Sequence, residues 1–160
     1  MAQADANVPA TVHGCAVLVG ARAVLIRGPA GSGKSRLALA LIEAAASGRL
    51  RFARLVADDR VALAACHGRL LARPPSTLAG LIEVRGLGIR RIAHEPIAVV
   101  GTVVDLAALD GARLPPTAVA ETVIAGVSLP RLAVAAGQDP CPAVMAYLAV
   151  PGAAPDIAEK

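Results

Sequence analysis

Residues 28–35 are the part of the sequence whose residue types and spacing most clearly indicate chemistry. They read Gly-Pro-Ala-Gly-Ser-Gly-Lys-Ser, the G-x-x-x-x-G-K-[ST] spacing of a phosphate-binding loop (P-loop). Glycines let the backbone curl with its N–H groups facing phosphate oxygens, and a following helix N-terminus adds partial positive charge. Lys34 would reach the β- and γ-phosphates of ATP, and the Ser35 hydroxyl would ligate Mg²⁺. The residues expected to bind the nucleotide are Gly28, Pro29, Ala30, Gly31, Ser32, Gly33, Lys34 and Ser35.

A chance match in a glycine-containing chain is the alternative, and the flanking sequence opposes it. Residues 23–26 are a short apolar run that favours a strand, and residues 36–46 are rich in Leu and Ala, which favour helix. Strand, glycine-rich turn and helix are the context that the motif needs. Lys34 is also one of only two lysines, against fourteen arginines, and the other lysine is the last residue, Lys160.

Asp58 and Asp59 are adjacent carboxylates that follow an apolar run at residues 54–57. The carboxyl end of a core strand is where phosphate-transfer sites place a Mg²⁺ partner or a catalytic base. One of the two could stay with the metal while the other accepts a proton from an attacking hydroxyl. An acidic turn that starts a hairpin would give the same sequence, and the sequence alone does not say which carboxylate does what.

Four further side chains could serve the same site, and each has a structural alternative. Glu83 and Arg85 alternate on an extended stretch, where such a pair is usually a surface ion pair of little energy. Close to phosphate, Glu83 could hold Mg²⁺ through water and Arg85 could contact the phosphate. A lone histidine such as His13 is more often structural, although it could supply a titratable donor at neutral pH. Arg113 lies in a proline-bounded loop, as either a surface residue or a mobile phosphate clamp.

The elements that must position these residues indicate an α/β fold. We expect a P-loop NTPase-like domain over residues 11–150, with a central mixed sheet and additional antiparallel hairpins, a flexible tail over residues 1–10 and a frayed tail over residues 151–160. The predicted strands cover residues 15–19, 23–27, 54–57, 61–65, 69–72, 81–84, 97–104, 122–127 and 129–134. The predicted helices cover residues 36–46 and 142–149.

Composition excludes several classes of protein. The chain has 160 residues, 56% of them hydrophobic and 18% charged, with a net charge of +4, which suits one domain with its own core. Phe52 and Tyr147 are the only aromatic residues, which argues against base-stacking recognition of single-stranded nucleic acid. Cys15, Cys66 and Cys141 have no metal-ligand spacing and indicate reduced cytoplasmic thiols. No apolar stretch has the length of a membrane span, so we expect neither a nucleic acid nor a membrane as partner.

Taken in order, these motifs resemble the C-terminal catalytic domain of the HPr kinase/phosphorylase family. The resemblance rests on His13-Gly14, the loop of residues 28–35, Val-Ala-Asp-Asp at 56–59 and Glu-Val-Arg-Gly-Leu-Gly-Ile at 83–89. That family uses ATP and Mg²⁺ to phosphorylate a serine of HPr, the phosphocarrier protein of the sugar phosphotransferase system. It also removes the phosphate by phosphorolysis, and its members assemble as hexamers. The chain is similar to the short form of the family found in some proteobacteria.

The resemblance also implies residue roles. Asp59 would be the base for the serine hydroxyl, His13 would support it, and Arg113 would be a catalytic arginine. Lys34 would bind phosphates, and Ser35, Glu83 and Asp58 would serve Mg²⁺. The family's loop for dephosphorylation ends in Gly-Arg-Asn, whereas residues 135–142 here read Ala-Ala-Gly-Gln-Asp-Pro-Cys-Pro. No residue is carried over there, so the phosphorylase reaction and the hexamer contacts stay open.

Two other functions remain compatible with the sequence. A P-loop kinase for a small molecule usually needs a lid and an acceptor pocket, and the chain after Gly88 is short for both. A nucleotide-dependent sensor would bind a phosphocarrier without catalysis. The missing Gly-Arg-Asn loop favours this interpretation slightly, whereas the intact Asp58, Asp59 and Glu83 oppose it. For a protein substrate, Arg90 and Arg91 are candidates for the docking surface.

Overall fold

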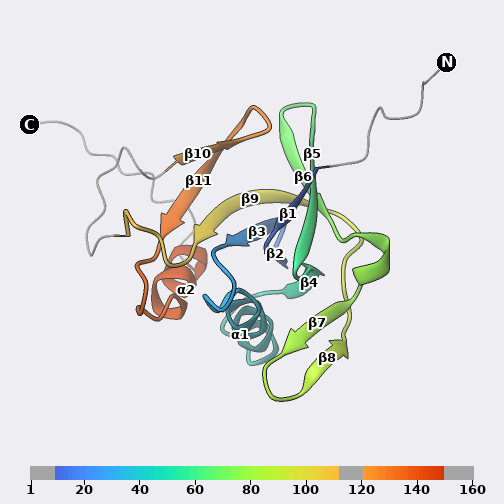
Figure 1. Cartoon of the computed structure of the whole chain (residues 1–160), viewed down its shortest axis with the longest axis vertical. Coiled ribbons are helices and arrows are strands. Elements are labelled where there is room, and N and C mark those ends of the chain that lie inside the picture. Colours follow the sequence, from blue (N-terminus) through green and yellow to red (C-terminus); the bar gives the residue numbers. More distant parts are fainter. Residues whose placement is uncertain (1–9, 112–120, 150–160) are drawn as a thin grey trace, which may run out of the picture.

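The computed structural model describes residues 10–111 and 121–149 (Figure 1). Residues 1–9, 112–120 and 150–160 lie outside this part of the chain, and with them most of the two predicted tails and the predicted clamp Arg113. The elements in chain order are β1 (Ala10–His13), β2 (Cys15–Val19), β3 (Arg22–Arg27), α1 (Lys34–Ala46), β4 (Ala53–Ala57), β5 (Arg60–Cys66), β6 (Arg69–Arg73), a 3₁₀ turn (Ser76–Leu78), β7 (Leu81–Val84), β8 (Gly88–Arg91), β9 (Ala98–Asp105), β10 (Glu121–Ile124), β11 (Val127–Ala133) and α2 (Cys141–Ala149).

Nine of the described strands form one mixed sheet. Its main path runs β1-β5-β6-β9-β3-β2-β4, and β11 pairs with both β9 and β10. The pairs β3–β9 and β9–β11 are parallel, and the remaining neighbours are antiparallel. β7 and β8 form a separate antiparallel hairpin. The mixed central sheet with antiparallel hairpins agrees with the prediction.

Four strands of the sheet end at the same edge. Asp105 at the end of β9 lies opposite both Arg27 of β3 and Ala133 of β11. β2 lies between β3 and β4 and is antiparallel to both, so β4 runs in the same direction as β3 and ends at the same edge, at Ala57. We call this edge, where β3, β4, β9 and β11 end, the C-terminal edge. In α/β sheets, ligands bind in the crevice outside the carboxyl ends of the strands.

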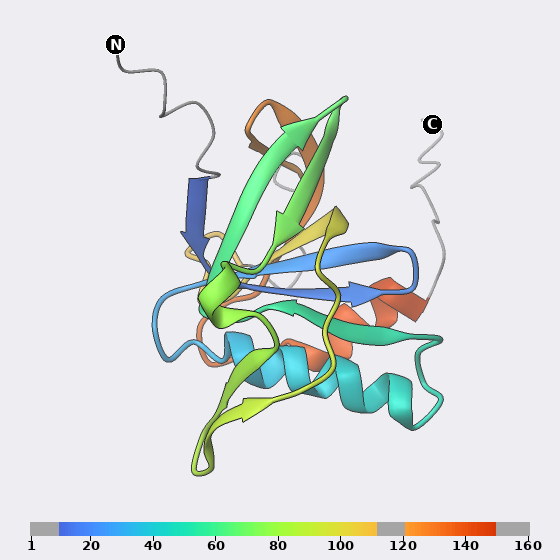
Figure 2. The same ribbon diagram turned by 90° about the vertical axis from the view of Figure 1, so that its right-hand side faces the viewer.

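The central strands bury both of their faces, which explains their continuous apolar runs. On one face Ile26 packs in a cluster with Leu41 of α1 and Val144 of α2. On the other face Leu25 packs in a second cluster with Leu70 of β6. Figure 2 shows the reason: the sheet curls so that the β5–β6 and β10–β11 hairpins stand on one side, with α1 and α2 on the other.

Most predicted elements are present, and the differences have local causes. β1 and β8 were not predicted, because each has only four residues and neither has a buried side chain to set up an apolar pattern. β10 and β11 meet at Ala125 and Gly126, whose φ angles of 49° and 78° form a tight turn, rather than at Ser128 as predicted. In the described residues no helix is long and apolar enough to cross a membrane.

Candidate functional site

The loop of residues 28–35, here called the glycine-rich loop, joins β3 to α1 at the C-terminal edge. Gly31 and Gly33 have φ angles of 78° and 98°, which L side chains rarely adopt. Gly28 has no room for a side chain, because a Cβ atom there would lie 2.5 Å from Ser32 Oγ and 3.1 Å from Leu106. Gly33 is the N-cap residue of α1 and makes no side-chain cap, so the first N–H groups of the helix face the loop. These features suit an anion ligand.

Lys34 places a cation inside this loop. Its Nζ donates to the carbonyl oxygens of Gly28 at 2.8 Å and of Pro29 at 3.0 Å, and the residue is only 8% exposed. Among the described residues no carboxylate forms an ion pair with it. An ammonium group attracts an anion more strongly than it attracts a neutral carbonyl oxygen, so a phosphate would be the better partner for Lys34.

Asp58 joins three elements beside the loop. Its Oδ1 accepts a hydrogen bond from Ser35 Oγ at 2.7 Å, and its Oδ2 accepts one from the backbone N–H of Glu83 at 3.1 Å. The buried carboxylate therefore connects the first turn of α1, the end of β4 and strand β7 near the turn of the β7–β8 hairpin. The buried Cys15 thiol lies next to this carboxylate. Burial raises the pKa of the thiol well above its ordinary value, and the charge of Asp58 raises it further. This thiol stays neutral beside the carboxylate.

The oxygen atoms of Ser35 and Asp58 are the groups best placed to hold Mg²⁺. Mg²⁺ prefers hard oxygen ligands and usually takes one or two carboxylates, with phosphate oxygens and waters completing its shell. The side chain of Glu83 is exposed, and it is the backbone N–H of this residue that contacts Asp58. The described residues contain no cluster of three His, Cys, Asp or Glu side chains that could hold a metal. The donor set fits Mg²⁺ bound together with a phosphate.

Asp59 and His13 form a solvent-facing pair next to Asp58. Asp59 Oδ1 lies 3.3 Å from His13 Nε2, and the side chains are 67% and 45% exposed. The tight turn from β4 into β5 gives Asp59 a φ angle of 68°, which Asp and Asn tolerate better than most residues. The N–H of Gly14 donates to the carbonyl oxygen of Asp59 at 3.1 Å and ties the two segments together. A carboxylate and an imidazole in contact can pass a proton between a substrate and solvent.

A charge network that the sequence analysis did not predict lies on the other side of the loop. Arg27, the residue before Gly28, donates Nε and Nη2 to the two carboxylate oxygens of Asp105 at 2.7 and 2.8 Å. Arg131 Nε donates to Asp105 Oδ2 at 2.6 Å, and its Nη1 and Nη2 donate to Asp110 at 2.7 and 2.9 Å. The network holds the ends of β3, β9 and β11 together. The signal available in the sequence was a charged residue at or near the end of each of three strands: Arg27 in β3, Asp105 in β9 and Arg131 in β11.

We expect Asp105→Asn to lower the free energy of unfolding by about 2 kcal/mol at neutral pH, because both arginines lose a charged acceptor. Burial alone would raise the pKa of Asp105, but the hydrogen bonds and charges of Arg27 and Arg131 outweigh it and lower this pKa. A group with a lowered folded-state pKa stabilises the fold above its unfolded pKa of about 3.9, and this contribution is lost as the pH falls through the folded value. Urea unfolding of both proteins at several pH values should therefore show their difference shrinking below about pH 4.

Two variants control for this experiment. Glu43→Gln removes a carboxylate from the exposed face of α1 and should leave stability unchanged. Asp110→Asn changes the exposed end of the network and should cost less than Asp105→Asn. Equal stability of wild type and Asp105→Asn at neutral pH would contradict the structural role of the network.

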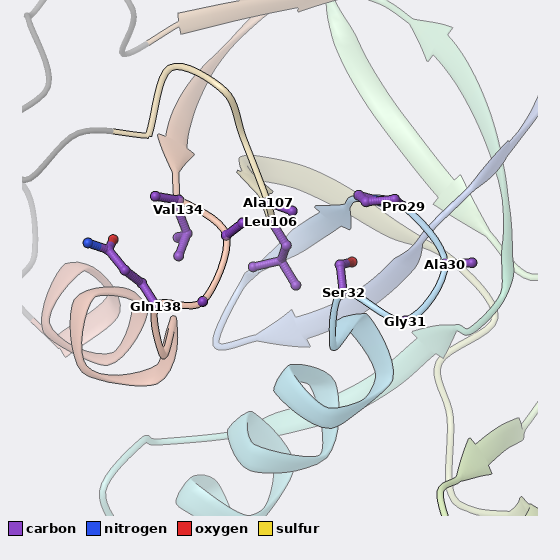
Figure 3. A pocket seen from close by; sticks show the side chains of 11 residues that line it. Pro29, Ala30, Gly31, Ser32, Leu106, Ala107, Val134 and Gln138 are labelled. Atoms are coloured by element: carbon purple, nitrogen blue, oxygen red, sulfur yellow. The ribbon is translucent and has the colours of Figure 1, made fainter.

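A cavity of about 320 Å³ lies on the β9 and β11 side of the glycine-rich loop (Figure 3). Its walls come from the loops that follow β3, β9 and β11, and Ser32 Oγ is buried there without a hydrogen-bond partner in the described part of the chain. The cavity is lined by Pro29, Ala30, Gly31, Ser32, Leu106, Ala107, Val134, Ala135, Ala136, Gly137 and Gln138. A second hollow of about 340 Å³ continues from it between the start of α1 and residues 137–141.

Comparison with known proteins identifies the family. Residues 6–95 match the family model of the HPr serine kinase C-terminal domain, which is more than half of the chain. The chain belongs to the HPr serine kinase C-terminal domain family. The HPr kinase/phosphorylases of Clostridium beijerinckii and Streptococcus thermophilus are each 44% identical to it, over 87 and 80 residues. These segments are 54% and 49% of this chain but only 26% and 24% of the relatives, so the match spans about a quarter of their length.

A solved structure extends the likeness of this HPr serine kinase family domain to most of the chain. The structure of the Hpr(Ser) kinase/phosphatase from Coxiella burnetii matches with a TM-score of 0.68 at 25% identity, over 86% of this chain and 87% of that chain. The mixed α/β fold with its curled sheet is therefore shared with that protein.

The structure gathers most of the predicted site residues of this family domain. Lys34, Ser35, Asp58 and the backbone of Glu83 meet beside the glycine-rich loop, and His13 pairs with Asp59. All of them lie within the matched residues 6–95. Their roles in catalysis stay predictions. The cavity walls after β9 and β11 lie beyond the matched segment, where sequence motifs offered no guide.

Proposed function

We propose that this family domain is an ATP-dependent protein-serine kinase that acts on the phosphocarrier HPr or a related phosphocarrier. One observation carries the proposal. At the C-terminal edge, the glycine-rich loop with its lysine ammonium group lies beside a buried aspartate and an exposed aspartate–histidine pair. Anion binding, metal binding and proton transfer are the three needs of phosphoryl transfer to a hydroxyl, which depends mainly on positioning and electrostatics.

ATP binding is assigned to the glycine-rich loop, acting as the P-loop of a P-loop NTPase-like fold. The N–H groups at the start of α1 and the Lys34 ammonium group would bind the β- and γ-phosphates. Ser35 and Asp58, with Glu83 beside them, would hold Mg²⁺, which neutralises phosphate charge when bound. The hydrogen bond between Ser35 and Asp58 keeps both oxygens at the base of the loop.

Proton transfer is assigned to Asp59. Its exposed carboxylate would take the proton of the acceptor serine as the serine oxygen bonds to the γ-phosphorus, while the bond from that phosphorus to the bridging oxygen breaks and ADP leaves with the electron pair. His13, at 3.3 Å from Asp59, orients the carboxylate and faces the same solvent. Arg113, outside the described residues, is the proposed catalytic arginine.

The protein acceptor needs a docking surface, and the β7–β8 hairpin is the candidate. Residues 85–91 are all exposed, with Leu87 61% and Ile89 65% exposed, and Arg90 and Arg91 follow. An apolar tip with arginines beside it suits an acidic protein surface. Glu83, close to the turn of the hairpin, ties β7 to Asp58, so a docked partner would lie close to the loop. We further propose a cytoplasmic location and a homo-oligomer.

The test is direct transfer to a phosphocarrier. Pure protein, ATP, Mg²⁺ and HPr are incubated, and the phosphorylated residue is located by mass spectrometry, with reactions lacking ATP or Mg²⁺ as controls. We expect phosphoserine on HPr only in the complete reaction. Tight ATP-dependent binding of HPr without any transfer would overturn the kinase proposal in favour of a nucleotide-dependent sensor. Adding inorganic phosphate and phosphorylated HPr tests the phosphorylase reaction.

A further inference from the structure

The two sides of the glycine-rich loop differ in chemistry. On the β4 side lie Asp58, Asp59 and His13, which are charged or titratable and suit a metal and a reacting hydroxyl. On the β9 and β11 side lies the cavity of about 320 Å³, whose walls are mostly apolar or backbone. The loop follows β3, which stands between β2 and β9 in the sheet, so a ligand lying along the loop reaches both sides.

We propose that this cavity takes the adenosine part of the bound nucleotide and that Gln138 contacts the adenine base. The inference rests on the proposed function, since it requires that the loop binds the phosphates of ATP. With the terminal phosphate directed at Asp58 and Asp59, the nucleoside must leave the loop on the opposite side. The cavity volume lies at the lower end of the range for small-molecule sites. Apolar walls from Leu106 and Val134 suit a base, which must leave water to bind.

Two local features support a ligand in this cavity. Ser32 Oγ is buried in its wall and makes no hydrogen bond within the described residues, so a polar atom is left for a ligand. Ala107, also in the wall, has a φ angle of 51°, and strained backbone of this kind persists at ligand sites. Figure 3 shows Ser32 on the loop side of the cavity and Gln138 across from it.

Gln138 is the polar side chain best placed to read the base. Gly137, with a φ angle of 80°, and a hydrogen bond from the Gln138 N–H to the Ala135 carbonyl at 3.2 Å hold it on a turn at the cavity rim. Its side-chain amide makes no hydrogen bond in the described part of the chain and is free to pair with a ligand. A carboxamide offers one donor and one acceptor, which match the N6/N7 edge of adenine but not the O6/N7 edge of guanine.

The experiment measures binding of ATP, GTP and inorganic tripolyphosphate to the full chain by calorimetry. The affinity for tripolyphosphate measures binding by the loop alone. The difference between the affinities for ATP and tripolyphosphate measures the contribution of the nucleoside. We expect ATP to bind at least about tenfold more tightly than either tripolyphosphate or GTP, the effect of one good base contact. Ala136→Phe, which fills the cavity, should reduce ATP affinity to that of tripolyphosphate and leave tripolyphosphate unchanged. Ala65→Phe, at an exposed end of β5, is the matched control and should change neither.

A change of specificity tests Gln138 itself. Arginine offers only donors and pairs with the O6/N7 edge of guanine, so Gln138→Arg should shift the ATP-to-GTP affinity ratio toward GTP by about tenfold or more. Taking the ratio cancels the general gain in affinity from the added positive charge, which tripolyphosphate measures separately. Gln138→Ala should lower the ratio without favouring GTP.

The outcomes separate this inference from the proposed function. Equal affinity of the wild type for ATP and tripolyphosphate, or unchanged ATP affinity in Ala136→Phe, would overturn the adenosine site and leave loop binding intact. An unchanged ATP-to-GTP ratio in Gln138→Arg would overturn the role of Gln138. Failure of both ATP and tripolyphosphate to bind the wild type would overturn the proposed function, and the inference with it.

Discussion

Asp59→Asn should reduce phosphoryl transfer to HPr by about 10²- to 10⁴-fold, the usual contribution of a general base. An amide cannot take the serine proton, although it fills the same space as the carboxylate. Because Asp59 contacts neither the glycine-rich loop nor Lys34 in the structure, ATP affinity should stay at the wild-type value. Rates of phosphoserine formation and calorimetric ATP binding, measured on the same preparations, separate the two effects.

Asparagine is the right replacement because of the backbone at this position. The φ angle of 68° is tolerated by Asp and Asn but strained for most other residues, so Asp59→Ala would combine a lost base with a strained turn. Glu43→Gln makes the same chemical change on the exposed face of α1 and should transfer phosphate at the wild-type rate. Transfer by Asp59→Asn within a factor of about three of wild type would fall far below the range for a general base and would assign the base elsewhere.

Lys34→Met should weaken ATP binding by about 10- to 100-fold, which corresponds to the loss of hydrogen bonds to a charged group. Transfer should fall further, because the same ammonium group would neutralise charge on the phosphate in flight. Methionine keeps the length of the side chain, and the carbonyl oxygens of Gly28 and Pro29 lie on a loop that water can reach, so the thermal unfolding midpoint should hardly change. Calorimetry with ATP and a thermal melt are the two measurements.

The control for Lys34→Met is the loss of a different positive charge. Arg69→Met removes one from an exposed position on β6 and should bind ATP like the wild type. Lys34→Arg keeps the charge but replaces a compact ammonium group with a planar fork, and it should not restore binding within the loop. Wild-type ATP affinity in Lys34→Met would contradict the assignment of this loop to phosphate.

The part of the site made by contiguous residues could be predicted from the sequence. The strand, the glycine-rich turn and the Leu- and Ala-rich helix of residues 23–46 are local signals, and their order brings Lys34 and Ser35 to the start of α1. Asp58 and Asp59 were also predicted from a local signal, because they directly follow the apolar run of residues 54–57. Which of them faces the loop depends on the tight turn after β4, and the structure directs Asp58 inward and Asp59 toward solvent.

The parts that depend on distant strand pairing were not predictable. Arg27 and Asp105 are 78 residues apart and meet only because β3 and β9 are parallel neighbours. The family resemblance paired His13 with Asp59, but the residue pattern alone did not. They meet because β1 pairs with β5, and no apolar pattern indicates so short and exposed a strand as β1. The cavity likewise needs three loops from separate strands, each of them ordinary in sequence. Hydrophobic periodicity and secondary-structure propensity carry no information on which strands will become neighbours in a sheet.

The opposite edge of the sheet, where β3, β4, β9 and β11 begin, carries none of the candidate site residues that the structure describes. The turn at Gly20 and Ala21 between β2 and β3 lies there, held by a hydrogen bond from the Gly20 N–H to the Phe52 carbonyl at 2.9 Å. Ala21 is exposed, and a strand's length separates it from the glycine-rich loop. A dye or a surface tether attached through an Ala21→Cys substitution would leave both sides of the loop open to ligands. The Gly20–Ala21 turn is therefore a suitable position for attaching the domain to a surface or a dye in single-molecule experiments.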